Sequence, residues 1–536
     1  MPVRLEQGGF FVRPWRRLVS IALPLLGACA LATATPLAAA PVPAAAAGGA
    51  TLTVASDNAI STLDPITSAS DEVQYLANVY QGLVYAAPPG SRQPYQPQLA
   101  VSWTHSQDGK TWTFELRRGV HFQDGSLMTA QDVVASLKLD FPQAGLLWQG
   151  VAALRATGPY TVVFTMKYPM NVAAMLTAEY NAWIVGPKAL KEPESWFDAG
   201  HSDGTGPYEI SRYQSSQSLV LTAMRNYWGG WKGAHYTTVV NDLVTDPSVQ
   251  QELVEGGQAQ LANGIPETSL ASVKADPNLN VVVAPSNDYY IAYYNTKVKP
   301  LTSQTVRQAL DYAIPYQAII AVATGGYGRQ MQGPLPYGVY PHDNALPQYH
   351  TDLAKARELL AKAGYPHGGF TLSMTCTTDI PECSLFAPLM KENFAKIGVG
   401  LTIRTVSSDE GLAVATGKPS KAQDIFILED WPEYVDDWID LYYNYGCYQP
   451  IQWNLSYACN APLNAMFNQA NALQVTNPAK AQALYDRYQQ GLLTFSPVAF
   501  LYDDRNVFVM AKTVGGFVNT PEYPAVVFYY DLHPQA

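Results

Sequence analysis

Residues 96–139 decide the fold class, and they read QPQLAVSWTHSQDGKTWTFELRRGVHFQDGSLMTAQDVVASLKL. Within this stretch, the segment Thr111–Phe122 is expected to form a strand, a turn around Arg117-Arg118-Gly119 and a second strand. Thr129 is expected to cap a helix, because Asp132 follows three residues later and apolar residues at helical spacing come next. Strand and helix patterns thus follow each other within one short segment.

The same alternation continues through the rest of the chain. Strands are expected at 51–55, 162–166, 218–222 and 399–406, and helices at 247–255, 306–313 and 353–363, with Gly or Pro after each helix. This alternation predicts a mixed α/β fold with sheets covered by helices. The chain has no internal repeat and no polar linker, so its domains are expected to interleave.

Composition excludes several classes of protein. The 536 residues carry a net charge of −11, with 48% hydrophobic and only 14% charged residues. Intrinsic disorder is excluded, because it requires low hydrophobicity and high net charge. A nucleic-acid-binding protein is also excluded, since it needs a basic face to displace counterions from phosphates. The length is sufficient for two to four domains that each bury a core.

The first 48 residues have the pattern of a secretory signal followed by an Ala/Pro-rich leader. Four arginines precede the apolar run Leu18–Leu26, and small residues follow. Cleavage at an Ala triplet and lipidation of Cys29 in a lipoprotein-like box are both consistent with this pattern. No later segment has the ~20 apolar residues of a membrane-spanning helix. The protein is therefore expected to be exported, either free in the periplasm or tethered to the outer face of the cytoplasmic membrane.

Export changes how the remaining four cysteines are interpreted. They form two close pairs in sequence, Cys376 with Cys383 and Cys447 with Cys459. Two local disulfides are the simplest of the three possible connectivities in an oxidising compartment. The spacing is not C-x-x-C and only a lone histidine, His367, lies nearby, so no metal site is expected.

A search for catalytic motifs finds none. The chain lacks G-x-S-x-G, H-E-x-x-H and G-x-x-x-x-G-K, and its eight histidines include no pair at i, i+4. We therefore predict a binding protein rather than an enzyme, and no cofactor.

The stretch 96–139 also resembles the signature of the family 5 extracellular solute-binding proteins of bacterial ABC transporters, which include dipeptide- and oligopeptide-binding proteins. Further landmarks of this family occur in order along residues 50–536. They include Thr62–Pro65, Asn78–Val84, Gly204–Tyr208, Arg225–Gly230, Tyr294–Thr296, Val306–Leu310, Ala354–Leu360 and Tyr457–Asn460. The last of these resembles the family's cysteine-bearing element, which supports the Cys447–Cys459 pairing.

The resemblance implies a type II periplasmic-binding-protein fold with two lobes and an extra subdomain in the first lobe. The first lobe would comprise 49–89, 201–292 and 499–536, the subdomain 90–200 and the second lobe 293–498. Ligand would lie between the lobes, which close over it, because only the closed state gains contacts with both lobes.

The resemblance also suggests ligand-binding residues. In peptide-binding members an acidic residue after a Trp pairs with the ligand's ammonium group, and Glu433 has this position after Trp431. Glu is longer than the family's Asp, and Asp436-Asp437 replaces its Asp-Pro, so a standard peptide ligand is in question. A solvated loop carboxylate is the alternative for Glu433. Ligand contacts are also predicted for the neighbouring Trp431 and Tyr434, for Tyr294 and Asn295 near the lobe crossing, and for Ile265.

The function implied is that of a receptor of an ABC importer, which binds peptides or a similar small solute and delivers it to the membrane permease. A monomer is expected, with the ligand and the permease subunits as its partners. Other members of this family bind metal chelates, haem or sugars, so a non-peptide ligand is one alternative. An exported hydrolase and a solute sensor on the same scaffold are the others.

Overall fold

The computed structural model describes residues 49–535 except 57–59, 69–71, 89–90, 144, 179, 267–268, 437, 449–452 and 524–525. The predicted signal segment, Cys29 and Asp437 lie outside the described residues. Within the described part of the chain, no helix has the length and apolar character needed to cross a membrane.

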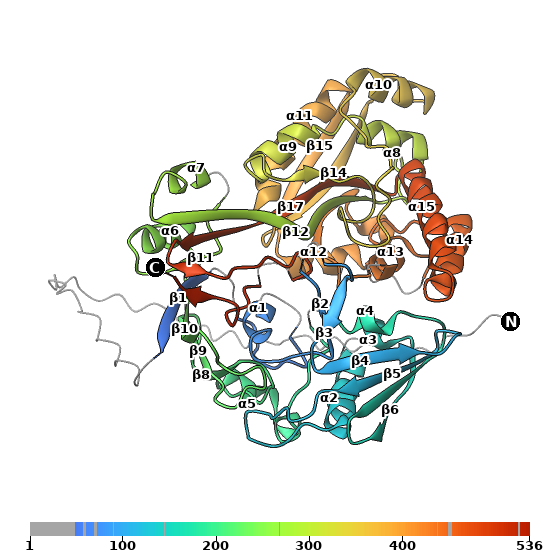
Figure 1. The fold of residues 1–536 in the computed structure, drawn as a ribbon. Helices are drawn as coiled ribbons and strands as arrows, with labels where there is room; N and C mark the ends of the chain where they lie inside the picture. The colour runs from blue at the N-terminus through green and yellow to red at the C-terminus, as the bar shows by residue number, and fades with distance from the viewer. Residues whose placement is uncertain are drawn as a thin grey trace, which may run out of the picture. The chain divides into compact units, whose positions relative to one another are not determined.

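One large mixed sheet runs through both lobes (Figure 1). Its strand order is β15-β14-β16-β12-β17-β11-β1-β10-β9-β8, and β13 pairs with β17 beside this path. The segments predicted for the first lobe contain β1 (Ala50–Ser56), β8 (Tyr208–Gln214), β9 (Ser218–Ala223), β10 (Tyr236–Leu243) and β11 (Leu261–Ala262). The segment predicted for the second lobe contains β13 (Arg329–Gln330), β14 (Phe370–Thr377), β15 (Val399–Val406) and β16 (Ile425–Asp430).

Two long antiparallel strands, β12 (Leu279–Tyr294) and β17 (Val498–Ala511), connect the lobes. Their pairing is irregular between Pro285 and Tyr289, where β12 has extra residues relative to β17. Such a bulge bends a strand and interrupts its hydrogen-bond ladder. The register shifts again between Tyr290 and Ile291, so the connection between the lobes is a pair of strands with two closely spaced irregularities.

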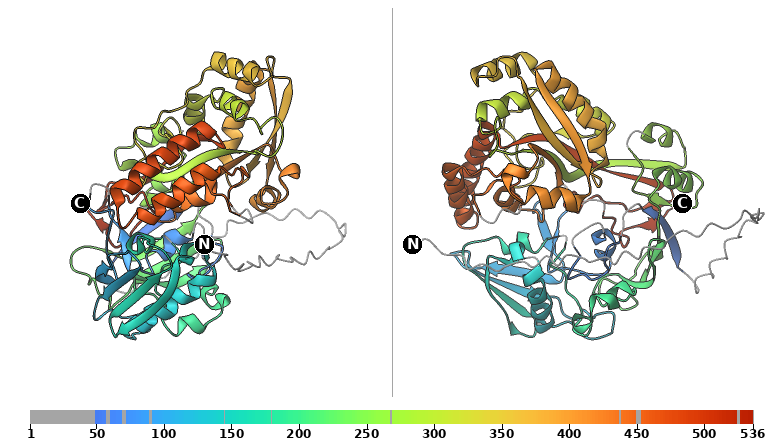
Figure 2. Two further views of the ribbon diagram at one scale, coloured as in Figure 1. Left: turned by 90° about the vertical axis from the view of Figure 1, so that its right-hand side faces the viewer. Right: turned by 180° about the vertical axis from the view of Figure 1, so that it is seen from behind.

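In the second lobe the two faces of β12 belong to different cores. Tyr290, Ala292 and Tyr294 pack in a core covered by α8 (Gln304–Asp311), α9 (Tyr316–Ala323), α10 (Leu353–Lys362) and α11 (Pro381–Lys396). The alternate residues Tyr289, Ile291 and Tyr293 pack with α13 (Trp438–Tyr445), α14 (Ala461–Leu473) and α15 (Pro478–Phe495). This is the two-residue period of a strand, with both faces buried. Figure 2 shows α14 and α15 side by side near β12.

The stretch 96–139 contributes two strands to a separate four-stranded sheet. Its order is β4-β5-β7-β6, with β4 (Ala100–His105), β5 (Thr111–Leu116), β6 (Val151–Gly158) and β7 (Thr161–Met166). The helices α2 (Ala130–Gln143) and α3 (Gly145–Trp148) follow β5. The predicted second strand before Phe122 is wrong: only His121 forms an isolated bridge, to Leu127. The turn at Gly119, with φ of +75°, leads into a loop instead.

The predicted helix starts are present with their caps. The Asp132 carboxylate accepts hydrogen bonds from the backbone N and the hydroxyl of Thr129, at 2.8 and 2.6 Å. Asp246 caps α6 (Pro247–Glu255), which ends before Gly256 as expected. The remaining elements are α1 (Val73–Leu76), α4 (Val172–Met175), α5 (Glu194–Asp198), α7 (Leu270–Val273), α12 (Ser408–Ala415), β2 (Val84–Ala86), β3 (Tyr95–Pro97), β18 (Val514–Gly515) and β19 (His533–Pro534), with short 3-10 helices at Ala189–Lys191 and Pro419–Lys421.

Both predicted disulfides are present in the structure. Cys376 is bonded to Cys383 within the core between β14 and α11, and Cys447 is bonded to Cys459 after the end of α13. The second disulfide closes the loop that leads from α13 to α14, so it fixes the C-terminal end of α13 to the start of α14.

Candidate functional site

Residues 431–436, which follow β16, contact a part of the chain predicted to belong to the first lobe. The backbone N of Val435 donates to Thr177 Oγ1 at 3.2 Å, and Asn171 Nδ2 lies 3.5 Å from Asp436 Oδ2. Asn171 and Thr177 flank the one-turn helix α4 of the first lobe. The predicted ligand residues of this loop are therefore at the junction of the lobes.

Glu433 is a half-buried carboxylate without a protein partner. Within the described residues it takes part in no hydrogen bond and none of the ion pairs. Burial, and then the negative charge of Asp430, raises the pKa of Glu433 to about 7. A carboxylate in this position gains from a positively charged partner, because such a partner compensates the cost of removing the charge from water.

A buried polar network lies beside Glu433. The Tyr289 hydroxyl on β12 is 2.9 Å from Oδ2 of Asp430 and also 2.9 Å from Oδ2 of Asp440 on α13. Asn444 Nδ2 donates to the same Asp430 oxygen at 2.7 Å, and Tyr293 Oη donates to Asn444 Oδ1 at 2.6 Å. The network thus joins β12, β16 and α13 through acidic, phenolic and amide groups.

Tyr443 adds a hydroxyl that lacks a partner. Its side chain is only 4% exposed, and within the described residues its hydroxyl makes no hydrogen bond. Burial is the main cause of the raised pKa of Tyr443. The nearby Glu433 carboxylate, the Tyr434 phenol and the Asp440 carboxylate raise this pKa further. A buried hydroxyl without a partner is costly, so this group is suited to bind a ligand or a water molecule.

The charge of this region is one-sided. From 422 to 479 the sequence contains seven acidic residues and no Lys, Arg or His. Among the described residues, no group of three or more His, Cys, Asp or Glu side chains is arranged to hold a metal ion. The excess of acidic groups in this segment attracts cations.

Asp436 also contacts Asn171, beside α4. It is 5% exposed, and burial raises its pKa to about 7, while the hydrogen bond from Asn171 opposes this shift. Its second oxygen, Oδ1, has no hydrogen-bond partner within the described residues. Among the described residues, the Asp436 carboxylate thus has one long hydrogen bond, to Asn171.

The other predicted contact residues lie in different places. Trp431 is half-buried next to Glu433, and Tyr434 is fully buried in the same core as Tyr289. Tyr294 instead lies on the opposite face of β12, where its hydroxyl donates to Asp311 in the core under α8. The strand period places Tyr293, not Tyr294, on the face of Asp430.

Asn295 and Ile265 are also held in interior positions. The Asn295 amide donates to the carbonyl oxygens of Pro419 and Gln423, at 2.8 and 3.2 Å. Ile265 is 3% exposed and packs in a small core with α6 and α7. The structure brings Trp431, Glu433 and Tyr434 together, and it does not bring Tyr294, Asn295 or Ile265 to them.

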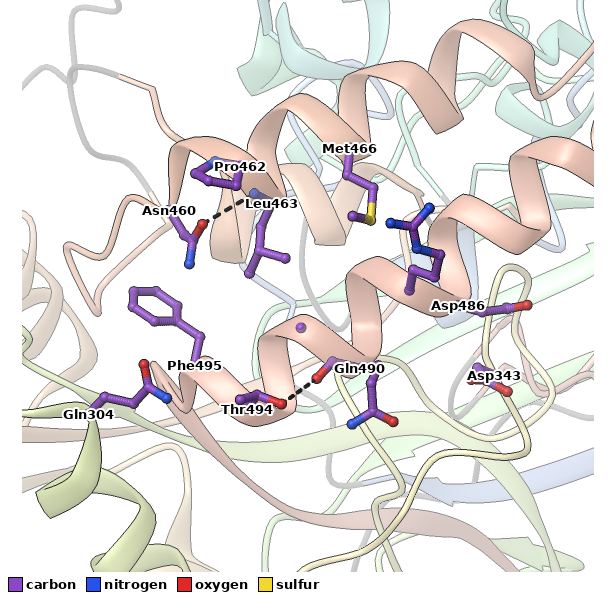
Figure 3. A pocket seen from close by; sticks show the side chains of 12 residues that line it. Gln304, Asp343, Asn460, Pro462, Leu463, Met466, Asp486, Gln490, Thr494 and Phe495 are labelled. Carbon is purple, nitrogen blue, oxygen red and sulfur yellow. Dashed lines mark hydrogen bonds between the residues drawn. The ribbon is translucent and has the colours of Figure 1, made fainter.

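A groove of about 720 Å³ lies elsewhere, against α14 and α15 (Figure 3). Asn460, Leu463, Met466, Gln490 and Phe495 are among the side chains that line it. Figure 3 shows Leu463 and Met466 on α14, Gln490 and Phe495 on α15, and Asn460 at the start of α14. None of the predicted ligand residues lines this groove, so we base the site on the chemistry of the lobe junction instead.

Sequence reasoning missed Asp430, Asp440, Tyr289, Tyr443 and Asn444. One signal was available: Asp440, Tyr443 and Asn444 are spaced i, i+3 and i+4, which places them on one face of a helix. The absence of basic residues from 422 to 479 was a second signal. The partnership with Tyr289 depends on strand pairing between distant segments, and no local pattern indicates it.

Two lobes of α/β structure joined by a pair of long strands are the architecture of a periplasmic binding protein. The structure is similar to the ABC transporter-associated periplasmic binding protein DppA of Helicobacter pylori in complex with the peptide STSA, with a TM-score of 0.77 and 23% identity over 91% of this chain and 98% of that one. It is also similar to NikA of Brucella suis in complex with Fe(III)-EDTA, with a TM-score of 0.79 and 19% identity over 90% and 100% of the two chains. At these identities, the likeness shows the fold alone.

The sequence identifies the family. Residues 94–451 match the family described as "Bacterial extracellular solute-binding proteins, family 5 Middle", and the chain belongs to this family. The glutathione-binding protein GsiB of Salmonella choleraesuis is 29% identical over 492 residues, which cover 90% of this chain and 94% of that protein. GsiB of Pectobacterium atrosepticum is 29% identical over 438 residues, covering 79% and 83%. The protein is thus an extracytoplasmic solute-binding protein of an ABC transporter and not an enzyme.

Proposed function

We propose that this protein is the receptor of an ABC importer for a small solute that carries an amino group, such as a short peptide or glutathione. The partner-free carboxylate of Glu433 at the lobe junction carries this proposal. An ammonium group would pair with Glu433 and remove the cost of its isolated charge. The names of the relatives support the solute class, since GsiB binds glutathione and the H. pylori structure contains a peptide.

The rest of the loop supports the same assignment. Trp431 is half-buried next to Glu433 and offers an aromatic face, which attracts cations as well as apolar groups. Tyr434 belongs to the same loop and is fully buried. We do not include Tyr294, Asn295 and Ile265 in the proposed site, because their side chains are engaged in other cores.

We also propose that the lobes move about the interruption of β12 at 285–289 and the facing part of β17. The pairing there already departs from a regular ladder, so bending costs fewer hydrogen bonds than elsewhere in the strands. Small-angle scattering should show a smaller radius of gyration on addition of a bound solute. An unchanged profile at saturation would argue against closure.

Calorimetry tests the ligand class directly. We expect glutathione or the dipeptide Met-Leu to bind the purified protein, and their N-acetylated forms to bind about 10²-fold or more weakly, because acetylation removes the positive charge. Glu433→Gln should weaken binding of the amine form by a similar factor. The matched control is Glu392→Gln, which removes an exposed carboxylate paired with Lys396 on α11. Equal binding of the acetylated forms would refute the proposal.

A further inference from the structure

A row of polar side chains crosses the large sheet from the candidate site to β13. Asp430 on β16 is paired with Tyr289 on β12, which is paired in turn with Asp503 on β17. On its other side, Asp503 is paired with Arg329 on β13. Directly paired residues of neighbouring strands point to the same face of a sheet. Arg329 therefore lies on the same face as Asp430, three strand positions away.

Arg329 has a guanidinium group with unused donors. It is half-buried, and its Cζ lies 3.7 Å from the centre of the Tyr337 ring. Within the described residues it donates no hydrogen bond and joins none of the ion pairs. Stacking on an aromatic ring uses the face of a guanidinium group and leaves the N–H groups in its plane available. Since Tyr337 is 53% exposed, the stacked pair is accessible to a ligand.

Two further basic groups lie close to Arg329. Arg505 follows Asp503 by two positions on β17, and its Nε donates to the carbonyl oxygen of Tyr327 at 3.3 Å. The Nζ of Lys274, at the end of α7, donates to the hydroxyl of Tyr327 at 2.6 Å. Neither group forms an ion pair among the described residues. This end of the row thus gathers three basic groups, whereas the segment 422–479 at the other end has none.

Asp503 does not hold the two guanidinium groups near it. Its side chain is 5% exposed, and its Oδ1 has no hydrogen-bond partner in the described part of the chain. Burial raises the pKa of Asp503 to about 7, and the Tyr337 backbone N–H and the charges of Arg329 and Arg505 oppose this shift. Neither arginine is ion-paired with it. A guanidinium group that its neighbouring carboxylate does not hold can bind another carboxylate through two N–H groups.

We propose that Arg329, with Arg505 beside it, binds a carboxylate group of the solute while Glu433 binds the ammonium group. The receptor then selects solutes that carry opposite charges at their two ends. This inference rests on the proposed function for the ammonium end only. The carboxylate end rests on the arginines themselves.

The distance between the two charged ends suits a short peptide. Neighbouring strands are about 4.8 Å apart, so the backbones at Arg329 and Asp430 are about 14 Å apart. An extended tripeptide spans about 10 Å, and the side chains of Arg329 and Glu433 can cover the remainder. The chain that follows β13 also returns to the Glu433 loop, because Tyr340 forms a parallel bridge with Asp436.

Calorimetry with glutathione and with its glycine amide tests the carboxylate contact. The amide lacks the carboxylate farthest from the ammonium group, so it should bind the unmodified protein about ten-fold or more weakly than glutathione. Arg329→Met should weaken glutathione binding by a similar factor. The same variant should change binding of the amide by less than about three-fold, because the amide has already lost the contact.

Two variants control for a change in the fold. Arg329→Lys should give an intermediate loss of glutathione affinity, since it keeps the charge but loses the planar pair of donors. Arg404→Met should leave binding unchanged, because Arg404 is exposed and paired with Glu410. An equal loss for glutathione and the amide in Arg329→Met overturns the subsite, since the arginine would then act without contacting the carboxylate.

The outcomes separate this subsite from the proposed function. If N-acetylation and Glu433→Gln leave binding unchanged while Arg329→Met discriminates between glutathione and the amide, the ammonium contact fails and the carboxylate subsite stands. The reverse pattern refutes the subsite and leaves the proposed function in place.

Succinate is a second probe, which carries carboxylates and no ammonium group. At the same ionic strength as a sodium chloride reference, succinate should raise the melting temperature of the unmodified protein and not that of Arg329→Met. This measurement decides the subsite even if glutathione does not bind. If neither glutathione nor succinate binds, the subsite is refuted.

Discussion

The carboxylates of Asp311 and Glu433 have similarly raised pKa values but differ in their hydrogen-bond partners. Burial raises the pKa of each to about 7. Asp311, however, accepts hydrogen bonds from Tyr294 at 2.9 Å and from Ser496 at 2.6 Å, with Arg307 close enough to lower its pKa. Glu433 has no such partners within the described residues. A shifted pKa therefore does not distinguish a structural acid from a ligand-binding one, whereas the set of partners does.

The comparison predicts the largest stability effect in the core of the second lobe. Arg307 is 2% exposed and donates to the carbonyl oxygens of Leu301, Phe495 and Ser496 at 2.6–2.7 Å. Arg307→Met should lower the free energy of unfolding by about 3–5 kcal/mol, because it strips three buried carbonyls of their donor and Asp311 of its neighbouring cation. Denaturant titration of the ligand-free protein measures the loss.

The control for this prediction is Lys396→Met, which breaks an exposed i, i+4 ion pair with Glu392. That change should cost less than about 1 kcal/mol. A loss below ~1 kcal/mol for Arg307→Met would mean that the hydrogen bonds around Asp311 do not hold the second lobe together.

The disulfides provide the next test, because one lies in each of the regions compared. Replacing either pair with serines should cost about 2–3 kcal/mol by the chain-entropy model. Cys447–Cys459 lies directly behind α13, which carries Asp440 and Tyr443, so its loss should also weaken amine binding. Loss of Cys376–Cys383, which lies in the core beside α11, should leave binding unchanged in the protein that remains folded.

Calorimetry at a temperature where both variants are folded separates these effects. Equal weakening of binding by both pairs of substitutions would show that the two regions are not independent. Mass mapping without reduction should find both pairings in the exported protein, and free thiols at Cys447 and Cys459 would contradict the structure.

The sequence predicts helix starts and ends well and strand pairing poorly. The caps at Thr129 and Asp246 and the helix ending at Gly256 follow from short-range chemistry, so local patterns were sufficient. The prediction of a second strand before Phe122 was wrong, because a strand needs a pairing partner. Within the described residues this segment pairs only through the bridge between His121 and Leu127.

The candidate site shows the same limit. Glu433 could be predicted, because the resemblance of its loop to the family is local in sequence. Tyr294 was selected over Tyr293 without information on which face of β12 lies toward α13, and that face depends on the register with β16 and β17. The contact between Tyr289 and the two carboxylates joins residues about 140–150 positions apart, which no spacing rule reveals.

The smallest expected effect is the pH dependence of stability, and it separates the two carboxylates most clearly. Each has a folded-state pKa of about 7, above the unfolded value, so the folded protein retains protons that the unfolded chain has lost. Their contribution to stability is therefore complete below about pH 4 and is lost as the pH rises through 7. For half-buried Glu433 the loss should be roughly 1 kcal/mol, reduced by solvent screening. Glu433→Gln and Asp311→Asn should each flatten the decline in melting temperature between pH 5 and pH 8.

Bound ligand should then change the contribution of Glu433 to the pH dependence of stability and leave that of Asp311 unchanged. Bound glutathione stabilises the ionised form of Glu433, so at saturation the Glu433 contribution to the decline should disappear from the unmodified protein. The Asp311 contribution should remain, because its partners belong to the protein and do not change when ligand binds. Thermal scans at pH 5 and pH 8, each with and without glutathione, give four melting temperatures for each variant. If glutathione abolishes the decline equally in the Asp311→Asn variant and in the Glu433→Gln variant, the carboxylate that senses the ligand is not Glu433, and the distinction between a satisfied and an unsatisfied buried acid fails for this protein.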